Sequence, residues 1–134
     1  MTRITRMKDR NTGDLLYKDL AYAVVGAAME VHSILGPGFT ETVYQTALER
    51  ELTLRRIPFV AQKRIQVCYK DVLVADYYLD LVVDDKIDVE LKAVDQLAPV
   101  HVSQVLSYLK ASGLKLGLLI NFGEARLRFQ RIAL

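Results

Sequence analysis

The segment Lys115–Phe122 is the part of this 134-residue chain that most restricts its fold. Its residues, Lys-Leu-Gly-Leu-Leu-Ile-Asn-Phe, are nearly all apolar, which is typical of a strand buried on both faces. The preceding residues predict a helix that begins at Pro99 and ends before Gly113. If that helix leads into a strand parallel to an earlier one, the result is an α/β sandwich.

The remaining elements follow from the spacing of apolar residues. Apolar residues recur every three or four positions over Tyr17–Leu35 and predict a first helix. Thr40 is the expected N-cap of a second helix, which runs to about Arg56. The predicted strands are Phe59–Tyr69, Val72–Val83, Ile87–Val94 and Leu127–Ala133. We therefore expect an α/β domain in which helices pack on a central mixed β-sheet.

The composition predicts one globular domain, because 51% of the residues are hydrophobic and 25% are charged. No apolar run approaches the roughly 20 residues that a membrane span requires. We expect a single domain over residues 15–134, preceded by a flexible basic arm over residues 1–14. That arm has no apolar stretch of the kind found in a signal peptide; its basic residues are Arg3, Arg6, Lys8 and Arg10.

The cysteine content and the net charge bear on location and partners. Cys68 is the only cysteine, so it cannot form an intrachain disulfide, and we expect a core residue in a cytoplasmic protein. The net charge of +2 is too small to indicate nucleic-acid binding by itself.

Charged residues interrupt two predicted strands in the middle of the chain. Because side chains alternate along a strand, Glu90 and Lys92 share one face while Leu91 lies on the other. A hairpin through residues 84–86 would place Asp80 opposite Glu90. The sequence therefore predicts two neighbouring carboxylates and a lysine on one polar face.

Two adjacent carboxylates repel each other unless a cation lies between them. A divalent metal is the usual cation, and oxygen ligands favour Mg²⁺ or Mn²⁺ over zinc. A neighbouring lysine can orient or deprotonate a water molecule. An exposed ion pair between Glu90 and Lys92 is the alternative, and it leaves Asp80 unexplained. The pattern is typical of metal-dependent hydrolysis of phosphodiester bonds.

Further candidates lie on the predicted helices. Glu41 begins the second helix and shares a face with Tyr44, so it is either a site residue or a carboxylate stabilised by the helix dipole, by ~0.3–1 kcal/mol. His101, Gln104 and Tyr108 form a polar stripe on the third helix, beside its apolar stripe. This polar stripe is either the wall of a cleft or a solvated flank.

Together these residues resemble the PD-(D/E)XK nuclease superfamily, whose core runs helix, three antiparallel strands, helix, strand. Gly38–Tyr44 fits the GxxExxY motif of a prokaryotic branch, and both Glu30–His32 and Leu35–Gly38 are similar to that branch. The resemblance extends from about residue 15 to the C-terminus. The sequence departs from the superfamily motif at Leu79, where the motif has proline.

The resemblance implies a role for each residue of the predicted polar face. Asp80 and Glu90 would bind Mg²⁺ or Mn²⁺ together with the backbone carbonyl of Leu91. Lys92 would hold the attacking water.

It also implies roles on the helices. Glu41 would contact the metal or a water. The pair Gln104-x-x-x-Tyr108 resembles the motif that follows Glu-x-Lys in RecB-like nucleases, where it would contact the substrate phosphate or steady the lysine. For Glu30 and His32, which lie beside the apolar face of the first helix, a cap or surface role is at least as expected as a role in the site.

The expected function is a metal-dependent nuclease that hydrolyses nucleic acid, with DNA as the expected substrate. A non-catalytic module that retains the fold and binds nucleic acid or protein is the alternative. A third interpretation is a Holliday-junction-type resolvase, which would require a dimer.

The last predicted strand bears on assembly. Arginine alternates with apolar residues over Arg126–Ile132, which predicts an edge strand with Leu127 and Phe129 towards the core and Ile132 as a further candidate for that face. Such an edge needs protection or a partner, and nucleases that cut both strands commonly work as twofold dimers. We therefore expect a homodimer, with an unidentified protein partner as a further expectation.

Overall fold

The computed structural model describes residues 15–134, so the predicted basic arm lies outside the described residues. The helices are α1 (Lys18–Leu35), α2 (Glu41–Leu54) and α3 (Pro99–Ser112), and the strands are β1 (Phe59–Tyr69), β2 (Val72–Val83), β3 (Ile87–Lys92), β4 (Leu116–Asn121) and β5 (Arg128–Ala133). Every predicted helix and strand is present, with ends shifted by a residue or two. Among the described helices, none is long and apolar enough to cross a membrane.

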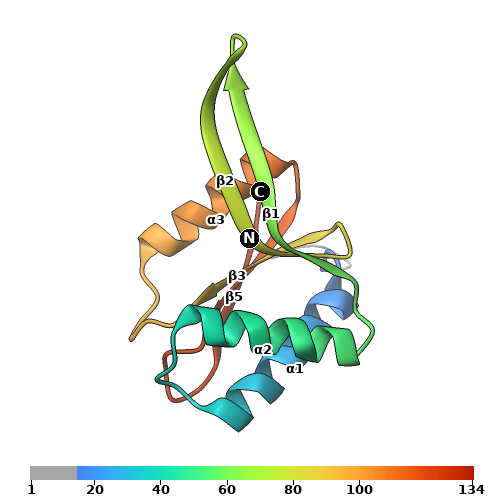
Figure 1. Ribbon diagram of the computed structural model, residues 1–134, viewed down its shortest axis with the longest axis vertical. Helices are drawn as coiled ribbons and strands as arrows, with labels where there is room; N and C mark the ends of the chain where they lie inside the picture. Colours follow the sequence, from blue (N-terminus) through green and yellow to red (C-terminus); the bar gives the residue numbers. More distant parts are fainter. Residues whose placement is uncertain (1–14) are drawn as a thin grey trace.

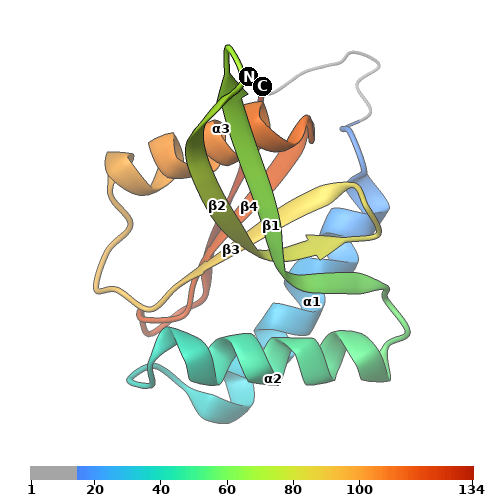
Figure 2. The ribbon, with the colours of Figure 1, turned by 45° about the horizontal axis from the view of Figure 1, so that its top comes forward.

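The strands form one mixed sheet in the order β1-β2-β3-β4-β5, in which only the β3–β4 pair is parallel. α3 connects these two parallel strands and packs on one face of the sheet, whereas α1 and α2 pack on the other (Figure 2). The predicted α/β class, with helices on a mixed sheet, is confirmed.

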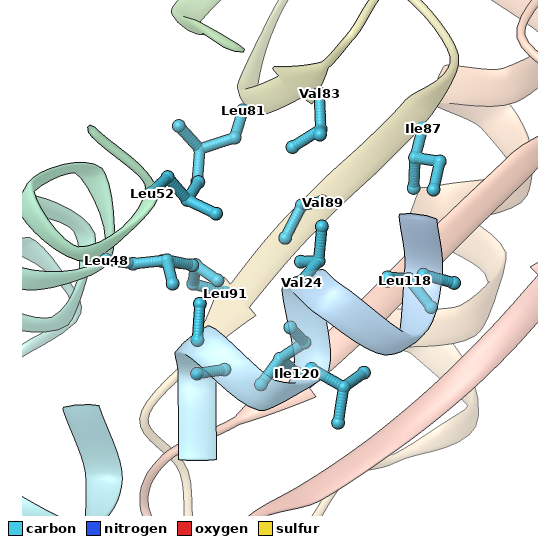
Figure 3. Packing of buried hydrophobic residues seen from close by; sticks show 14 of the residues in the cluster. Val24, Leu48, Leu52, Leu81, Val83, Ile87, Val89, Leu91, Leu118 and Ile120 are labelled. Atoms are coloured by element: carbon cyan, nitrogen blue, oxygen red, sulfur yellow. The ribbon is translucent and has the colours of Figure 1, made fainter. Parts of the chain in front are cut away.

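Two apolar clusters hold these layers together. The larger one lies between the sheet and the pair α1–α2, where Val24, Leu48 and Leu91 meet (Figure 3). The smaller one, beneath α3, contains Val105, Leu109, Leu119 and Ile132. β4 contributes to both clusters and every one of its residues is buried, so the predicted burial on both faces is confirmed.

The β1–β2 hairpin extends beyond these layers (Figure 1). Its turn residues, Lys70 and Asp71, both have positive φ, as a two-residue hairpin turn of the favoured twist requires. Near the tip, Tyr69 and Val72 are each 62% exposed, and Cys68 is exposed too. The expectation that Cys68 is a core residue is therefore wrong, because none of the helices described in residues 15–134 covers this outer part of the ribbon.

β5 lies at the edge of the described sheet, as predicted, and pairs with β4. Leu127 packs against the larger cluster and Ile132 lies in the smaller one. Phe129, which was expected to face the core, is 45% exposed. Its side of the strand faces a cavity of about 550 Å³ beside α1, so none of the described helices closes over the ring.

His32 also differs from the expectation of a cap or surface role. It is buried, and its Nε2 lies 2.9 Å from the backbone carbonyl of Glu124. Glu124 belongs to the loop after β4, which passes close to the last turn of α1 and shields the imidazole. His32 therefore links α1 to this loop, whereas Glu30 is exposed as expected.

The chain just after β3 is held against the end of β4. Asn121 is fully buried; its Oδ1 accepts from the Val94 N–H at 3.0 Å and its Nδ2 donates to the Val94 carbonyl at 2.9 Å. The Phe122 N–H donates to the Lys92 carbonyl at 2.8 Å. These bonds fix the backbone directly after the predicted Glu-x-Lys pair.

We expect Gly123→Ala to destabilise the fold by about 1–3 kcal/mol, because it overpacks this region. An added Cβ would lie 2.3 Å from the carbonyl oxygen of Val94 and 2.6 Å from its nitrogen, and backbone atoms cannot rotate away. Gly26→Ala in α1 is the matched control: its Cβ meets only Arg55 Nη1 at 3.5 Å, and the helix should gain up to about 1 kcal/mol. Urea denaturation measures both, and a Gly123→Ala protein as stable as wild type would contradict the close approach.

Candidate active site

β2 leaves both of its hydrogen-bonded ladders at Asp80. β1 pairs with β2 on either side of this point, but Gln62 and Asp80 do not pair. β2 pairs with β3 only over Leu81–Val83. The backbone of Asp80 instead makes hydrogen bonds to two side chains. Its N–H donates to Glu90 Oε2 at 3.1 Å, and its carbonyl accepts from Gln45 Nε2 at 2.9 Å.

The predicted carboxylate pair meets at this break. The register pairs Leu81 with Val89, so Asp80 and Glu90 follow one residue further along, on the same face. Asp80 Oδ2 accepts a hydrogen bond from the Leu91 N–H at 2.8 Å. In each carboxylate, one oxygen thus accepts a hydrogen bond from a backbone N–H of the opposite strand. Within residues 15–134, no N–H donor reaches the second oxygen of either group.

Burial makes the charged form of both groups costly. Glu90 is 3% exposed, and burial, followed by its contact with Asp88, raises its pKa. Burial also raises the pKa of Asp80, against the opposing effects of the Leu91 N–H and of Lys92. A cation placed between two such carboxylates would relieve both the burial cost and their mutual repulsion.

Asp88 adds a third carboxyl to this face. It is fully buried, and neither of its oxygens has a hydrogen-bond partner among the described residues. Burial is the main cause of its raised pKa. The raised pKa of Glu90 keeps this carboxyl protonated in the metal-free protein, so Glu90 can donate its proton in a hydrogen bond to Asp88. The structure therefore places a carboxyl in need of a proton or a cation beside the pair.

Lys92 lies at the other end of this face, where its Nζ donates to Gln104 Oε1 at 3.0 Å. Tyr108 lies one turn further along α3, and its ring packs on that of Tyr77 with centroids 5.0 Å apart. Burial, and then the charges of the nearby carboxylates, raise the pKa of Tyr108, so its hydroxyl keeps its proton at neutral pH. The structure thus brings two of the three predicted polar residues of α3 to the site.

The third, His101, has a structural contact instead. Its Nδ1 accepts a hydrogen bond from the Ala98 N–H at 2.9 Å, which caps α3. The first turn of a helix has N–H groups without intrahelical partners, and His101 satisfies one at the helix start.

Glu41 faces Asp80 across a cavity of about 330 Å³. The residues that line this cavity come from α2 and three strands: Glu41, Thr42, Gln45, Gln62, Asp80 and Leu91. Glu41 is exposed, because the buried face of α2 is formed by Tyr44 and Leu48. Over residues 15–134, no three Asp, Glu, His or Cys side chains are grouped closely enough to hold a metal.

The donor set still fits a hard divalent cation. Asp80 and Glu90 each keep one carboxylate oxygen free of N–H donors, and Leu91 lines the same cavity as Asp80. Magnesium is commonly bound by one or two carboxylates and keeps several water ligands, so two protein carboxylates suffice.

A match with a protein-family model decides the classification. Residues 18–132 match the model of the PD-(D/E)XK nuclease superfamily. The chain belongs to this superfamily. The matched range includes every candidate residue from Glu41 to Tyr108, and the predicted superfamily is confirmed.

A comparison with solved structures agrees with the superfamily fold. The chain is similar to the crystal structure of SSO0001, with a TM-score of 0.56 and 19% sequence identity. The similarity covers 87% of this chain and 57% of SSO0001. No curated protein sequence matches the chain.

Three residues that line this cavity escaped the sequence analysis: Thr42, which directly follows Glu41, and the two glutamines Gln45 and Gln62. Gln45 lies one helical turn after Glu41, and that spacing could have indicated its place in the site. Gln62 lies in β1, opposite Asp80, and no motif around it marks it. Both reach the cavity only because β1 and α2 meet at the break in β2.

Proposed function

We propose that this PD-(D/E)XK protein is a metal-dependent nuclease that hydrolyses phosphodiester bonds, with DNA as its substrate. One observation carries the proposal: Asp80 and Glu90 meet at the break in β2, with Lys92 on the same face and held by Gln104. This arrangement combines a cation-binding pair of carboxylates with a positive group that can act on water.

Asp80, Glu90 and the backbone carbonyl of Leu91 would hold Mg²⁺ or Mn²⁺. When bound, such an ion polarises a phosphate and lowers the pKa of a bound water. Lys92 Nζ orients the attacking water, and Gln104 keeps Lys92 in one position. Tyr108, whose hydroxyl keeps its proton, serves as a neutral donor towards the phosphate.

We also place the chain in the GxxExxY branch, on the basis of Gly38–Tyr44. Glu41 in that motif lines the cavity beside Asp80, where it would contact a metal-bound water. Cleavage of both DNA strands would need two such sites, so we propose that the protein acts as a homodimer.

A non-catalytic module that binds nucleic acid or protein is the second candidate. It is favoured by the lack of a third converging metal ligand in the described part of the chain. Incubation of supercoiled DNA with the purified protein and Mn²⁺, with Asp80→Ala as control, distinguishes the two functions. Cleavage by the wild type alone supports the nuclease, and intact DNA in both reactions supports the module.

We expect millimolar Mn²⁺ or Mg²⁺ to raise the melting temperature of the wild type by roughly 5–15 °C, since an ion that binds only the folded state adds ~2.7 kcal/mol at a hundred times its Kd. Asp80→Asn should raise the melting temperature of the metal-free protein, because burial penalises the charged carboxylate. The same variant should lose most of the metal response. Asp76→Asn, which changes an exposed aspartate of β2, is the matched control and should keep the response. Differential scanning fluorimetry measures all three proteins.

The metal response should depend on pH. The folded protein binds more protons at Asp80 and Glu90 than the unfolded chain, because both pKa values are raised. The contribution of these groups to metal-free stability is therefore largest at acidic pH and is lost as the pH rises through their folded pKa values. Protons also compete with the metal, so the response should be smaller near about pH 5 than near neutrality. An equal response at both would contradict carboxylate ligands.

A further inference from the structure

Gln62 has an unusual backbone conformation for a strand residue. Its φ of 51° lies in the left-handed region, which favours glycine, yet it occurs within β1. The pairing of β1 with β2 continues in the same register on both sides, so neither strand contains an extra residue here. The ladder has a register shift between Val67 and Cys68, and it is also interrupted, without such a shift, where Gln62 stands opposite Asp80. Strained backbone of this kind is concentrated at functional sites.

The side chain of Gln62 lines the cavity beside Asp80. The ionisable groups in that lining are two carboxylates, Glu41 and Asp80, so within residues 15–134 a phosphate entering the cavity meets no lysine or arginine in its lining. Uncharged donors must therefore contact the substrate oxygens that the bound cation does not reach. Such donors add no positive charge that would compete with a metal for the carboxylates.

The lining has two amide side chains, and one of them is already engaged. Gln45 Nε2 donates to the Asp80 carbonyl at 2.9 Å and to Glu49 Oε2 at 2.9 Å. The side-chain amide of Gln62 makes no hydrogen bond to another residue within residues 15–134. Of the two amides, that of Gln62 is therefore free to bind a ligand in this cavity, and the Thr42 hydroxyl is a further uncharged donor in the lining.

We propose that Gln62 is a substrate-binding residue whose amide N–H donates to a phosphate or sugar oxygen of the nucleotide next to the cleaved bond. The proposal rests on the proposed nuclease function. The left-handed backbone turns β1 so that this side chain meets the cavity. Glycine would adopt that conformation with less strain. A function of the side chain therefore explains why the residue at this position is glutamine.

The test compares Gln62→Gly with Gln66→Gly, because Gln66 lies on the same strand, away from the cavity lining. With a short fluorescein-labelled DNA duplex and Mn²⁺, Gln62→Gly should raise KM about tenfold and leave kcat within about twofold. Its melting temperature should equal or exceed that of the wild type, because the strain is relieved. Gln66→Gly should lower the melting temperature and leave KM unchanged. Gln62→Asn, which tolerates the left-handed conformation and keeps an amide, should recover part of the affinity.

Three results would overturn the proposal: a wild-type KM in Gln62→Gly, a loss of kcat at constant KM, or a lowered melting temperature. If the wild type does not cleave the duplex, the nuclease proposal fails, and fluorescence anisotropy with the same duplex decides the role of Gln62. Weaker binding by Gln62→Gly than by the wild type would then support its role in substrate binding. Equal binding, or no binding by either protein, would overturn it.

Discussion

Lys92→Ala is expected to lower kcat for DNA cleavage by about 10²–10³-fold, the loss that follows removal of one group that stabilises charge in a transition state. The variant should fold normally, because Lys92 is absent from both apolar clusters and its Nζ contacts Gln104 at the site. Gel analysis of supercoiled DNA in Mn²⁺ measures the rate. Cleavage at the wild-type rate would contradict the proposed role of the lysine.

Two further variants separate this role from a general effect of charge. Lys86→Ala removes a lysine from the turn between β2 and β3, where Lys86 forms an ion pair with Asp84 at the surface. Its rate should stay within about twofold of wild type, because exposed ion pairs contribute little. Gln104→Ala should lose about tenfold, as expected when a residue that orients a functional group is removed.

Leu91→Asp is expected to prevent folding. Leu91 is 1% exposed and lies in the larger apolar cluster, on the face of β3 opposite Glu90 and Lys92. Burying an unpaired carboxylate there costs several kcal/mol, which is comparable to a total stability of about 5–15 kcal/mol. Circular dichroism during thermal denaturation measures the outcome.

Controls for Leu91→Asp use the same site and the same new residue. Leu91→Met keeps the volume and should cost less than about 1.5 kcal/mol. Leu73→Asp places the same carboxylate on the exposed hairpin, where Leu73 is 48% exposed, and should change stability by less than about 0.5 kcal/mol. A Leu91→Asp protein that melts cooperatively would show that β3 presents its faces the other way round.

The carboxylate pair could be predicted because local rules determine it. Alternation along β3 places Glu90 and Lys92 together, and the short turn before it sets which residue of β2 lies opposite. Asp80 therefore follows from spacing and turn length alone. The same rules identified the helix stripe that brings Gln104 to Lys92.

Exposure could not be predicted in the same way. Alternation states that Phe129 and Ile132 face opposite sides of β5, but not which side a helix covers. Alternation also cannot show that the outer part of the β1–β2 hairpin, which contains Cys68, extends past the helices. These outcomes depend on the lengths and the packing of elements that are distant in the sequence.

The sequence by itself determined the helices and strands, their order, the apolar character of β4 on both faces and the shared face of Glu90 and Lys92, because each depends on residues within a few positions of one another. Only the tertiary structure decided that Gln62 enters the cavity and that Asp88 is buried without a hydrogen-bond partner among the described residues. Both depend on contacts between distant segments: β1 against β2 for the glutamine, and α3 over β3 for the aspartate. The local sequence does not predict such contacts, because the burial and hydrogen bonding of a residue depend on the distant segments that pack against it.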